Sequence, residues 1–349
     1  MTEEEASSPP HVHFWTRRLG AETQWDPDAD PDRHPSAYGH AFLELYWRMR
    51  AEDRPVSIGP VIASQASTVL SSLEETADWG GRIQPRMAAR LALALLRLKH
   101  MPAVALVRVD AMLTVAAAGY TTLELMPTRA AISRRRQVWL PLLPQRGMIP
   151  RAGDRRAMMR TVAIKAYAQN VPDWVDDEFV RRVGELGYAL RIDDEDSGLW
   201  RDFGEVDVVL CTHDSATVRD ARRKPATKLI NAWRAGVIHI CASHIGYTEL
   251  AVPDETAVFA GTDDAEGFLD ALQRLKTEPA LGRRVRDASP GSQFSPEVIV
   301  DRYWQALTTA RRANRTVVGA ALCRALVEES RLRLRRRLRA RTAGDVQTS

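Results

Sequence analysis

Residues 224–237 read Lys224-Pro225-Ala226-Thr227-Lys228-Leu229-Ile230-Asn231-Ala232-Trp233-Arg234-Ala235-Gly236-Val237, and residues 243–250 read Ser243-His244-Ile245-Gly246-Tyr247-Thr248-Glu249-Leu250. The apolar spacing of the first stretch predicts a helix over 227–234 that ends at Gly236, because glycine is favoured just beyond a helix. Residues 237–242 then predict a buried strand, and residues 247–251 a short helical turn. A helix, a strand and a turn in this order are typical of one unit of a doubly wound α/β sheet.

The same alternation extends through the rest of the second half of the chain. We predict strands over 161–167, 188–192, 206–211 and 256–260, and helices over 173–186, 264–277, 279–288 and 296–310. Residues 206–211 are continuously apolar, as expected of a parallel strand that is covered on both faces.

The first half of the chain shows a weaker version of this pattern. Strands are predicted over 11–16, 54–58, 103–109 and 138–143, and helices over 38–51 and 86–98. A Pro- and Gly-rich connection over 144–153 marks a domain boundary. We therefore predict an α/β protein with two Rossmann-like doubly wound domains, residues 1–145 and 146–310, and a C-terminal helical basic tail over 311–349. A chain of 349 residues accommodates two domains of about 150 residues each.

Composition limits the cellular setting. No apolar run approaches the roughly 20 residues that span a bilayer, and the first residues are acidic rather than basic as in a signal peptide. The three cysteines, Cys211, Cys241 and Cys323, show no metal-type spacing, and we interpret them as reduced thiols. These features predict a cytoplasmic protein.

The net charge of +4 is distributed unevenly. From Arg311 onward there are eleven arginines and three acidic residues, so the tail carries +8 and the rest of the chain −4. An apolar stripe at Val317, Ala321, Leu322, Ala325 and Leu326 precedes the basic run 331–341. Such a helix can lie on an anionic membrane surface, which predicts peripheral association with the inner membrane face through 311–341. Docking of the helix on the acidic body is the alternative. No nucleic-acid partner is expected, because the positive charge is confined to the tail.

Several enzyme classes are excluded by missing motifs. The sequence has no Gly-x-Gly-x-x-Gly after its first strand, no Walker loop, no Gly-x-Ser-x-Gly elbow and no His-Glu-x-x-His. This counts against dehydrogenases, P-loop enzymes, serine hydrolases and zinc proteases. The acidic run 193–196 is interpreted as a solvated loop, and we expect neither a metal site nor a cofactor.

The opening stretch predicts an anion site instead. Pro225 suits the first turn of a helix, with Lys224 before it and Thr227 within that turn, and a helix start favours an anion. Lys228 lies four residues after Lys224, so both ammonium groups would lean over one face and suit a diphosphate. The alternative is that both lysines lie on a solvated helix face.

The second stretch predicts ligand contacts after a strand. Glu249 follows a strand, Gly246 and a turn, where a carboxylate would accept the hydroxyls of a ribose, and His244 lies at the same strand end. An exposed glutamate near a turn and a chance histidine are the plain alternatives.

These residues resemble the nucleotide-sugar domain of GT-B glycosyltransferases. The corresponding residues are Asn231-Ala232, Gly236, Gly246-Tyr247-Thr248-Glu249, Asp263-Asp264 and Glu278-Pro279-Ala280-Leu281. The resemblance covers roughly residues 140 to 310 and implies a nucleotide-diphosphate sugar as donor substrate and an unknown acceptor. It implies Lys224, Thr227, Lys228, Asn231, His244, Gly246 and Glu249 as substrate-binding residues.

One departure leaves the activity open. Many retaining members of this family carry a glutamate pair where this sequence has Arg223 and Asn231. Asn231 is therefore either a ligand or a structural hydrogen-bonding residue. In the first half, Asp110 follows a strand end and is the leading candidate for a catalytic base, although a turn cap would place an aspartate there too.

The leading interpretation is a glycosyltransferase, with retention or inversion undetermined. The alternatives are a non-catalytic nucleotide-sugar-binding protein, a sugar-nucleotide epimerase on the same architecture, and a membrane adaptor that acts through the tail.

Overall fold

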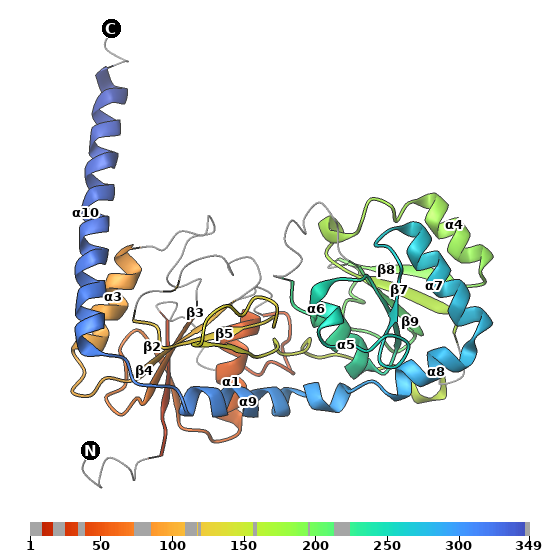
Figure 1. Cartoon of the computed structure of the whole chain (residues 1–349), viewed down its shortest axis with the longest axis horizontal. Helices are drawn as coiled ribbons and strands as arrows, with labels where there is room; N and C mark the ends of the chain where they lie inside the picture. The colour runs from red at the N-terminus through yellow and green to blue at the C-terminus, as the bar shows by residue number, and fades with distance from the viewer. Residues whose placement is uncertain are drawn as a thin grey trace.

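The computed structural model describes residues 9–16, 25–33, 39–72, 85–108, 117, 120–155, 159–194, 196–212 and 224–345. Two parallel sheets lie side by side, each with helices packed around it, and a long C-terminal helix stands at the far end of the first (Figure 1).

The described part of the chain builds the first sheet from six strands in the order β2-β1-β3-β4-β5-β6. Their bounds are β1 Val12–Trp15, β2 Val56–Gly59, β3 Thr68–Ser72, β4 Ala103–Val107, β5 Leu123–Met126 and β6 Gln137–Trp139. All neighbouring strands are parallel. Helices α1 (Glu44–Ala51), preceded by a π-helical turn over Gly39–Leu43, and α3 (Pro85–Leu96) pack against this sheet.

The second sheet contains five strands among the described residues, in the order β11-β10-β9-β7-β8. Their bounds are β7 Thr161–Lys165, β8 Ala189–Asp193, β9 Val208–Cys211, β10 Ile238–Cys241 and β11 Val258–Phe259. Again every neighbouring pair is parallel. The strand order reverses between β7 and β9, and open α/β sheets bind ligands beside such a point, at the carboxyl ends of the strands.

Helices cover both faces of the second sheet. Helices α4 (Asp177–Glu185), α7 (Ala265–Thr277) and α8 (Pro279–Asp287) pack on one face through a core that contains Phe179, Phe268 and Val285. Helix α5 (Thr227–Ala235) packs on the other face. Side chains alternate between the faces, as the two-residue repeat of a strand requires, because Val162 and Ile164 join the first core and Ala163 the second.

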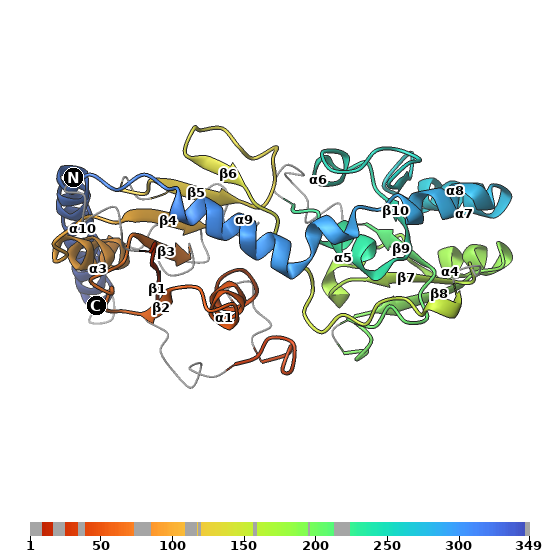
Figure 2. The ribbon, with the colours of Figure 1, turned by 90° about the horizontal axis from the view of Figure 1, so that it is seen from below.

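The chain crosses back to the first sheet at its C-terminal end. Helix α9 (Pro296–Thr308) runs between the two halves and reaches the first sheet (Figure 2). There the Thr68 hydroxyl donates to the Leu307 carbonyl at 2.7 Å, and Ala103 forms a bridge with Arg312. Helix α10 (Arg315–Asp345) then packs beside α3 (Figure 1).

The α/β architecture agrees with the sequence prediction, with three differences. Strands β3 and β5 were not predicted. In the tail, Val318 is buried against α3, whereas Val317 and Leu326 of the predicted apolar stripe are exposed. The third difference concerns the acidic run 193–196, because Asp193 is fully buried rather than solvated.

The domain boundaries at 145/146 and 310/311 stay predictions. Among the described residues, none of the helices combines the length and the apolar composition that crossing a bilayer requires. Association of the tail with an anionic membrane also stays a prediction.

Candidate functional site

The carboxyl ends of β9 and β11 bring a threonine and an aspartate close to a lysine of α5. The Lys228 ammonium donates to the Thr212 carbonyl at 2.6 Å, and the Thr212 hydroxyl donates to an Asp263 carboxylate oxygen at 2.9 Å. Thr212 follows β9 directly, and Asp263 lies four residues after β11. The next residue, Asp264, caps α7 by accepting from the Gly267 amide at 2.9 Å. A short acidic turn therefore faces the lysine across the edge of the sheet.

The surroundings of the Lys228 ammonium favour binding of an anion. The pKa of Lys228 is lowered from 10.5 to about 8, chiefly by burial; the positive charge of Lys224 contributes to this lowering, and Asp263 opposes it. A partly buried ammonium beside a second lysine gains stability when a negative charge binds near it. The charge of Lys224 therefore acts on Lys228, and the joint anion-binding role of the two lysines stays a prediction.

The local backbone differs from the prediction that grouped these lysines. Helix α5 begins at Thr227 with Ala226 as its capping residue, so Thr227 lies in the first turn as expected. Pro225 and Lys224 precede the helix, and the expectation that Pro225 lies in its first turn is wrong. Lys224 and Lys228 are therefore not neighbours one helical turn apart, although the charge of Lys224 still acts on Lys228.

His244 and Gly246 form a tight turn against Lys224. His244 caps the short helix α6 (Ile245–Thr248), and its Nδ1 accepts from the Gly246 amide at 3.1 Å. Burial lowers the pKa of His244 to about 4, and the charge of Lys224 contributes, so the imidazole is neutral at pH 7. A Cβ added at Gly246 would lie 2.4 Å from the Lys224 carbonyl oxygen. Only glycine therefore permits this close approach.

Glu249 and Asn231 contact the first half of the chain. The Glu249 carboxylate accepts from the backbone amides of Arg129 and Ala130 at 2.9 and 2.8 Å. The Asn231 side-chain oxygen accepts from the Gln145 amide at 2.9 Å. Both side chains thus hold segments that precede the second sheet, and their ligand roles stay predictions.

The structure does not describe the predicted catalytic base. Asp110 lies outside the described residues, as does Arg223. Within the described residues, no group of three or more His, Cys, Asp or Glu side chains is arranged to hold a metal ion.

Sequence reasoning missed Thr212 and Asp263 as members of the site. Thr212 carried a usable signal, because it follows the continuously apolar strand 206–211 at its carboxyl end. Asp263 was noted only as part of an acidic turn. Asp263 and Thr212 follow strands of one sheet, β11 and β9, with β10 between them. The spacing of residues in the sequence does not reveal this strand order.

Comparison with known proteins identifies the fold. No family model matches the sequence, and no curated protein matches it. The structure is similar to that of HepE from Anabaena bound to UDP, with 10% sequence identity, coverage of 86% of this chain and 100% of HepE, and a TM-score of 0.50. It is also similar to the catalytic domain of starch synthase IV from Arabidopsis thaliana bound to ADP and acarbose. There the identity is 9%, the coverage is 89% of this chain and 100% of that domain, and the TM-score is 0.50.

At such low identity these similarities establish the fold. Two Rossmann-like domains of the GT-B type, as the sequence resemblance implied, are confirmed.

Proposed function

We propose that this protein is a glycosyltransferase that takes its sugar from a nucleotide-diphosphate sugar. The observation that carries the proposal is the position of Lys228: its ammonium lies at the carboxyl end of β9, beside the reversal of strand order, with a second lysine near it. Open α/β sheets bind ligands at this edge, and the two positive charges favour an anionic ligand there. The UDP bound to HepE and the ADP bound to starch synthase IV give the same class of ligand.

The reaction requires a leaving diphosphate. The bond from the anomeric carbon to the diphosphate oxygen breaks, a bond from the acceptor oxygen to that carbon forms, and the acceptor proton passes to a base. Lys228 and Lys224 would offset the negative charge that grows on the diphosphate, which is an electrostatic contribution that needs no proton transfer. Asp110 remains the proposed base, and the acceptor stays open.

Thermal-shift measurements test the donor site. UDP, GDP, dTDP and ADP, alone and as their sugar conjugates, are added to the wild-type protein, and at least one is expected to raise the melting temperature. Lys228→Met should abolish most of that rise. Lys276→Met is a matched control, because Lys276 is exposed in the last turn of α7. If no nucleotide stabilises the wild type, the proposal is wrong.

A second candidate function is binding of the nucleotide sugar without turnover. One observation favours it: Asn231 stands where many relatives have a glutamate, and its side-chain oxygen is engaged by the Gln145 amide. Release of free sugar and nucleoside diphosphate from the stabilising donor distinguishes the candidates. Turnover above that of a Lys228→Met control supports the enzyme, and tight binding without turnover supports the non-catalytic protein.

A further inference from the structure

Two aromatic rings lie at the carboxyl edge of the second sheet. Tyr167 follows β7 by two residues, and Trp200 lies in the connection between β8 and β9. Their ring centroids are 5.1 Å apart, with an angle of 36° between the ring planes. Tyr167 is 41% exposed and Trp200 is partly buried, so part of the pair faces solvent. The lysine site described above does not use either ring.

The topology places this pair close to the lysine site. β7 and β9 are parallel neighbours, with Val162 beside Val208 and Ala163 beside Val209. Continuing that register brings the end of β7 beside the end of β9, which precedes Thr212. Adjacent strands are about 4.8 Å apart. Tyr167 and the Thr212 carbonyl that binds Lys228 therefore leave one edge of the sheet from adjacent strands, at the point where the strand order reverses.

The pair also lies on the same side of the sheet as Lys228. Side chains alternate along a strand, and Ala163 packs in the core that contains Leu229 of α5. Lys165 continues this alternation, since its ammonium lies 4.4 Å from the ring centroid of Phe203 in the same core. Ala166 joins the opposite core, so Tyr167 leaves the end of β7 toward the α5 face. Because Lys228 is on α5, a ligand whose phosphates lie at Lys228 has the pair beside it on the same face.

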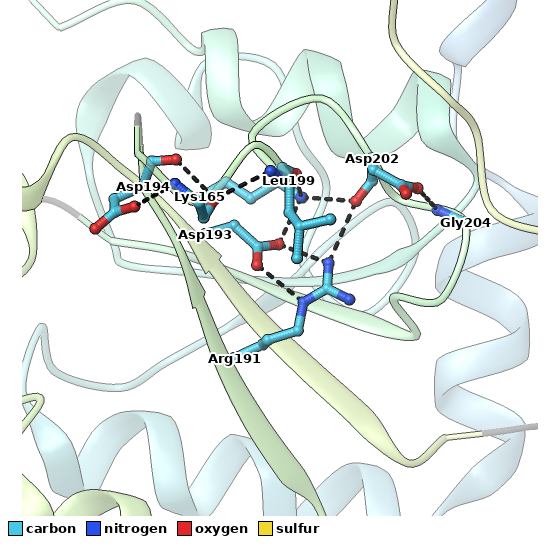
Figure 3. Close-up of polar contacts among 8 residues, drawn as sticks. Lys165, Arg191, Asp193, Asp194, Leu199, Asp202 and Gly204 are labelled. Atoms are coloured by element: carbon cyan, nitrogen blue, oxygen red, sulfur yellow. Dashed lines mark hydrogen bonds and ion pairs between the residues drawn. The ribbon is translucent and has the colours of Figure 1, made fainter.

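A buried lysine holds the segment that carries Trp200. The Lys165 ammonium donates to an Asp193 carboxylate oxygen at 2.7 Å and to the carbonyls of Leu199 and Asp202, both at 2.8 Å (Figure 3). The backbone is therefore fixed on both sides of Trp200.

Asp193 is held in turn by Arg191, which donates to its two oxygens at 2.9 and 2.8 Å (Figure 3). The three bonds from Lys165 to Asp193, Leu199 and Asp202 satisfy all three N–H donors of its ammonium, as burial requires. A ring on a fixed segment binds a flat ligand with little loss of conformational entropy.

We propose that Tyr167 and Trp200 form the stacking site for the nucleobase of the donor, with Lys165 as the positioning residue for Trp200. This inference rests on the proposed function and adds the residues that bind the base. Aromatic side chains stack on bases with little preference among them, because every base has a π-face. The site then has two parts, with the diphosphate at Lys228 and the base at the aromatic pair.

Calorimetric titration with two probes tests whether the base and the diphosphate bind at these two separate parts of the site. The nucleoside diphosphate that stabilises the wild type contains a base, and inorganic pyrophosphate does not. Trp200→Leu and Tyr167→Leu should each weaken nucleotide binding by about 5- to 160-fold, the range that one base stack contributes. Pyrophosphate affinity should change less than twofold. Trp200→Phe should retain most of the nucleotide affinity, and Lys276→Met, at an exposed position of α7, should leave both affinities unchanged.

The role of Lys165 has its own readout. The difference in fluorescence between the wild type and Trp200→Phe is the contribution of Trp200. Nucleotide binding to the wild type should quench this contribution. Lys165→Met should reduce that quenching and weaken the nucleotide while leaving pyrophosphate affinity intact.

Failure of the two proposals is distinguishable. If no nucleotide binds the wild type, the proposed function fails. If a nucleotide binds wild type and Trp200→Leu equally well, the stacking site is wrong and the donor site stands. An equal loss of nucleotide and pyrophosphate in Trp200→Leu would assign Trp200 a structural role and also overturn the inference.

Discussion

Nucleotide affinity should fall about tenfold between pH 7 and pH 9 if the Lys228 ammonium faces the diphosphate. The pKa of Lys228 is lowered to about 8 by burial. At that pKa about nine in ten molecules carry the charge at pH 7, and about one in eleven at pH 9. The diphosphate binds the charged form, so the observed affinity follows that fraction. The expected tenfold loss corresponds to about 1.4 kcal/mol.

The assay is a titration with the stabilising nucleoside diphosphate at constant ionic strength across this pH range. Lys228→Arg should flatten the profile, because a guanidinium keeps its charge throughout. Lys228→Met should flatten it at a weaker overall affinity, and Lys276→Met should leave the wild-type slope intact. A wild-type affinity that changes less than twofold, with binding clearly present, would refute the placement of the diphosphate at Lys228.

Four further outcomes are expected. Burial lowers the pKa of His13 to about 4, so only the unfolded chain takes up this proton between pH 6.5 and 4. The contribution of His13 to the free energy of unfolding is complete above pH 6.5 and about 2 kcal/mol smaller at pH 5. His13→Gln should reduce this pH dependence, measured by urea unfolding. Gly246→Ala should destabilise the fold by about 1–3 kcal/mol, since its Cβ would meet the Lys224 carbonyl oxygen; Gly184→Ala, which has open space, should not lower the melting temperature. Glu249→Ala should cost about 1 kcal/mol of stability, and it should weaken nucleotide but not pyrophosphate if the carboxylate also binds ribose. Replacing the arginines of 331–341 by glutamine should abolish flotation with anionic vesicles, whereas equal flotation of both proteins would dismiss membrane recruitment.

The periodicity of apolar residues predicted the helices and strands around residues 224–237 because each of them is long or continuously apolar. Strand β5 escaped prediction for a physical reason. β5 is four residues long and contains Glu124, which is buried only because Arg108 and Arg136 pair with it at 2.6 Å. A pattern search treats that glutamate as a surface residue.

The missing parts of the site depend on contacts between distant segments. Lys165 and Asp193 pair because β7 and β8 are neighbours, and nothing in their spacing shows this. Glu249 meets amides about 120 positions earlier in the chain. The grouping of Lys224 with Lys228 was argued from a helical spacing that the structure does not have, since the helix starts after Pro225.

The return of the chain to the first sheet has a consequence for biosynthesis. Thr68 binds Leu307, 239 positions later, and Val318 completes the core around α3. A ribosome that adds about 5–20 residues per second needs about ten to thirty seconds to pass from β6 to Leu307. Throughout that interval the nascent first sheet has no α9 or α10 to cover it. Its apolar surface is then available to chaperones, and this half of the protein acquires its full stability only after Val318 has been synthesised.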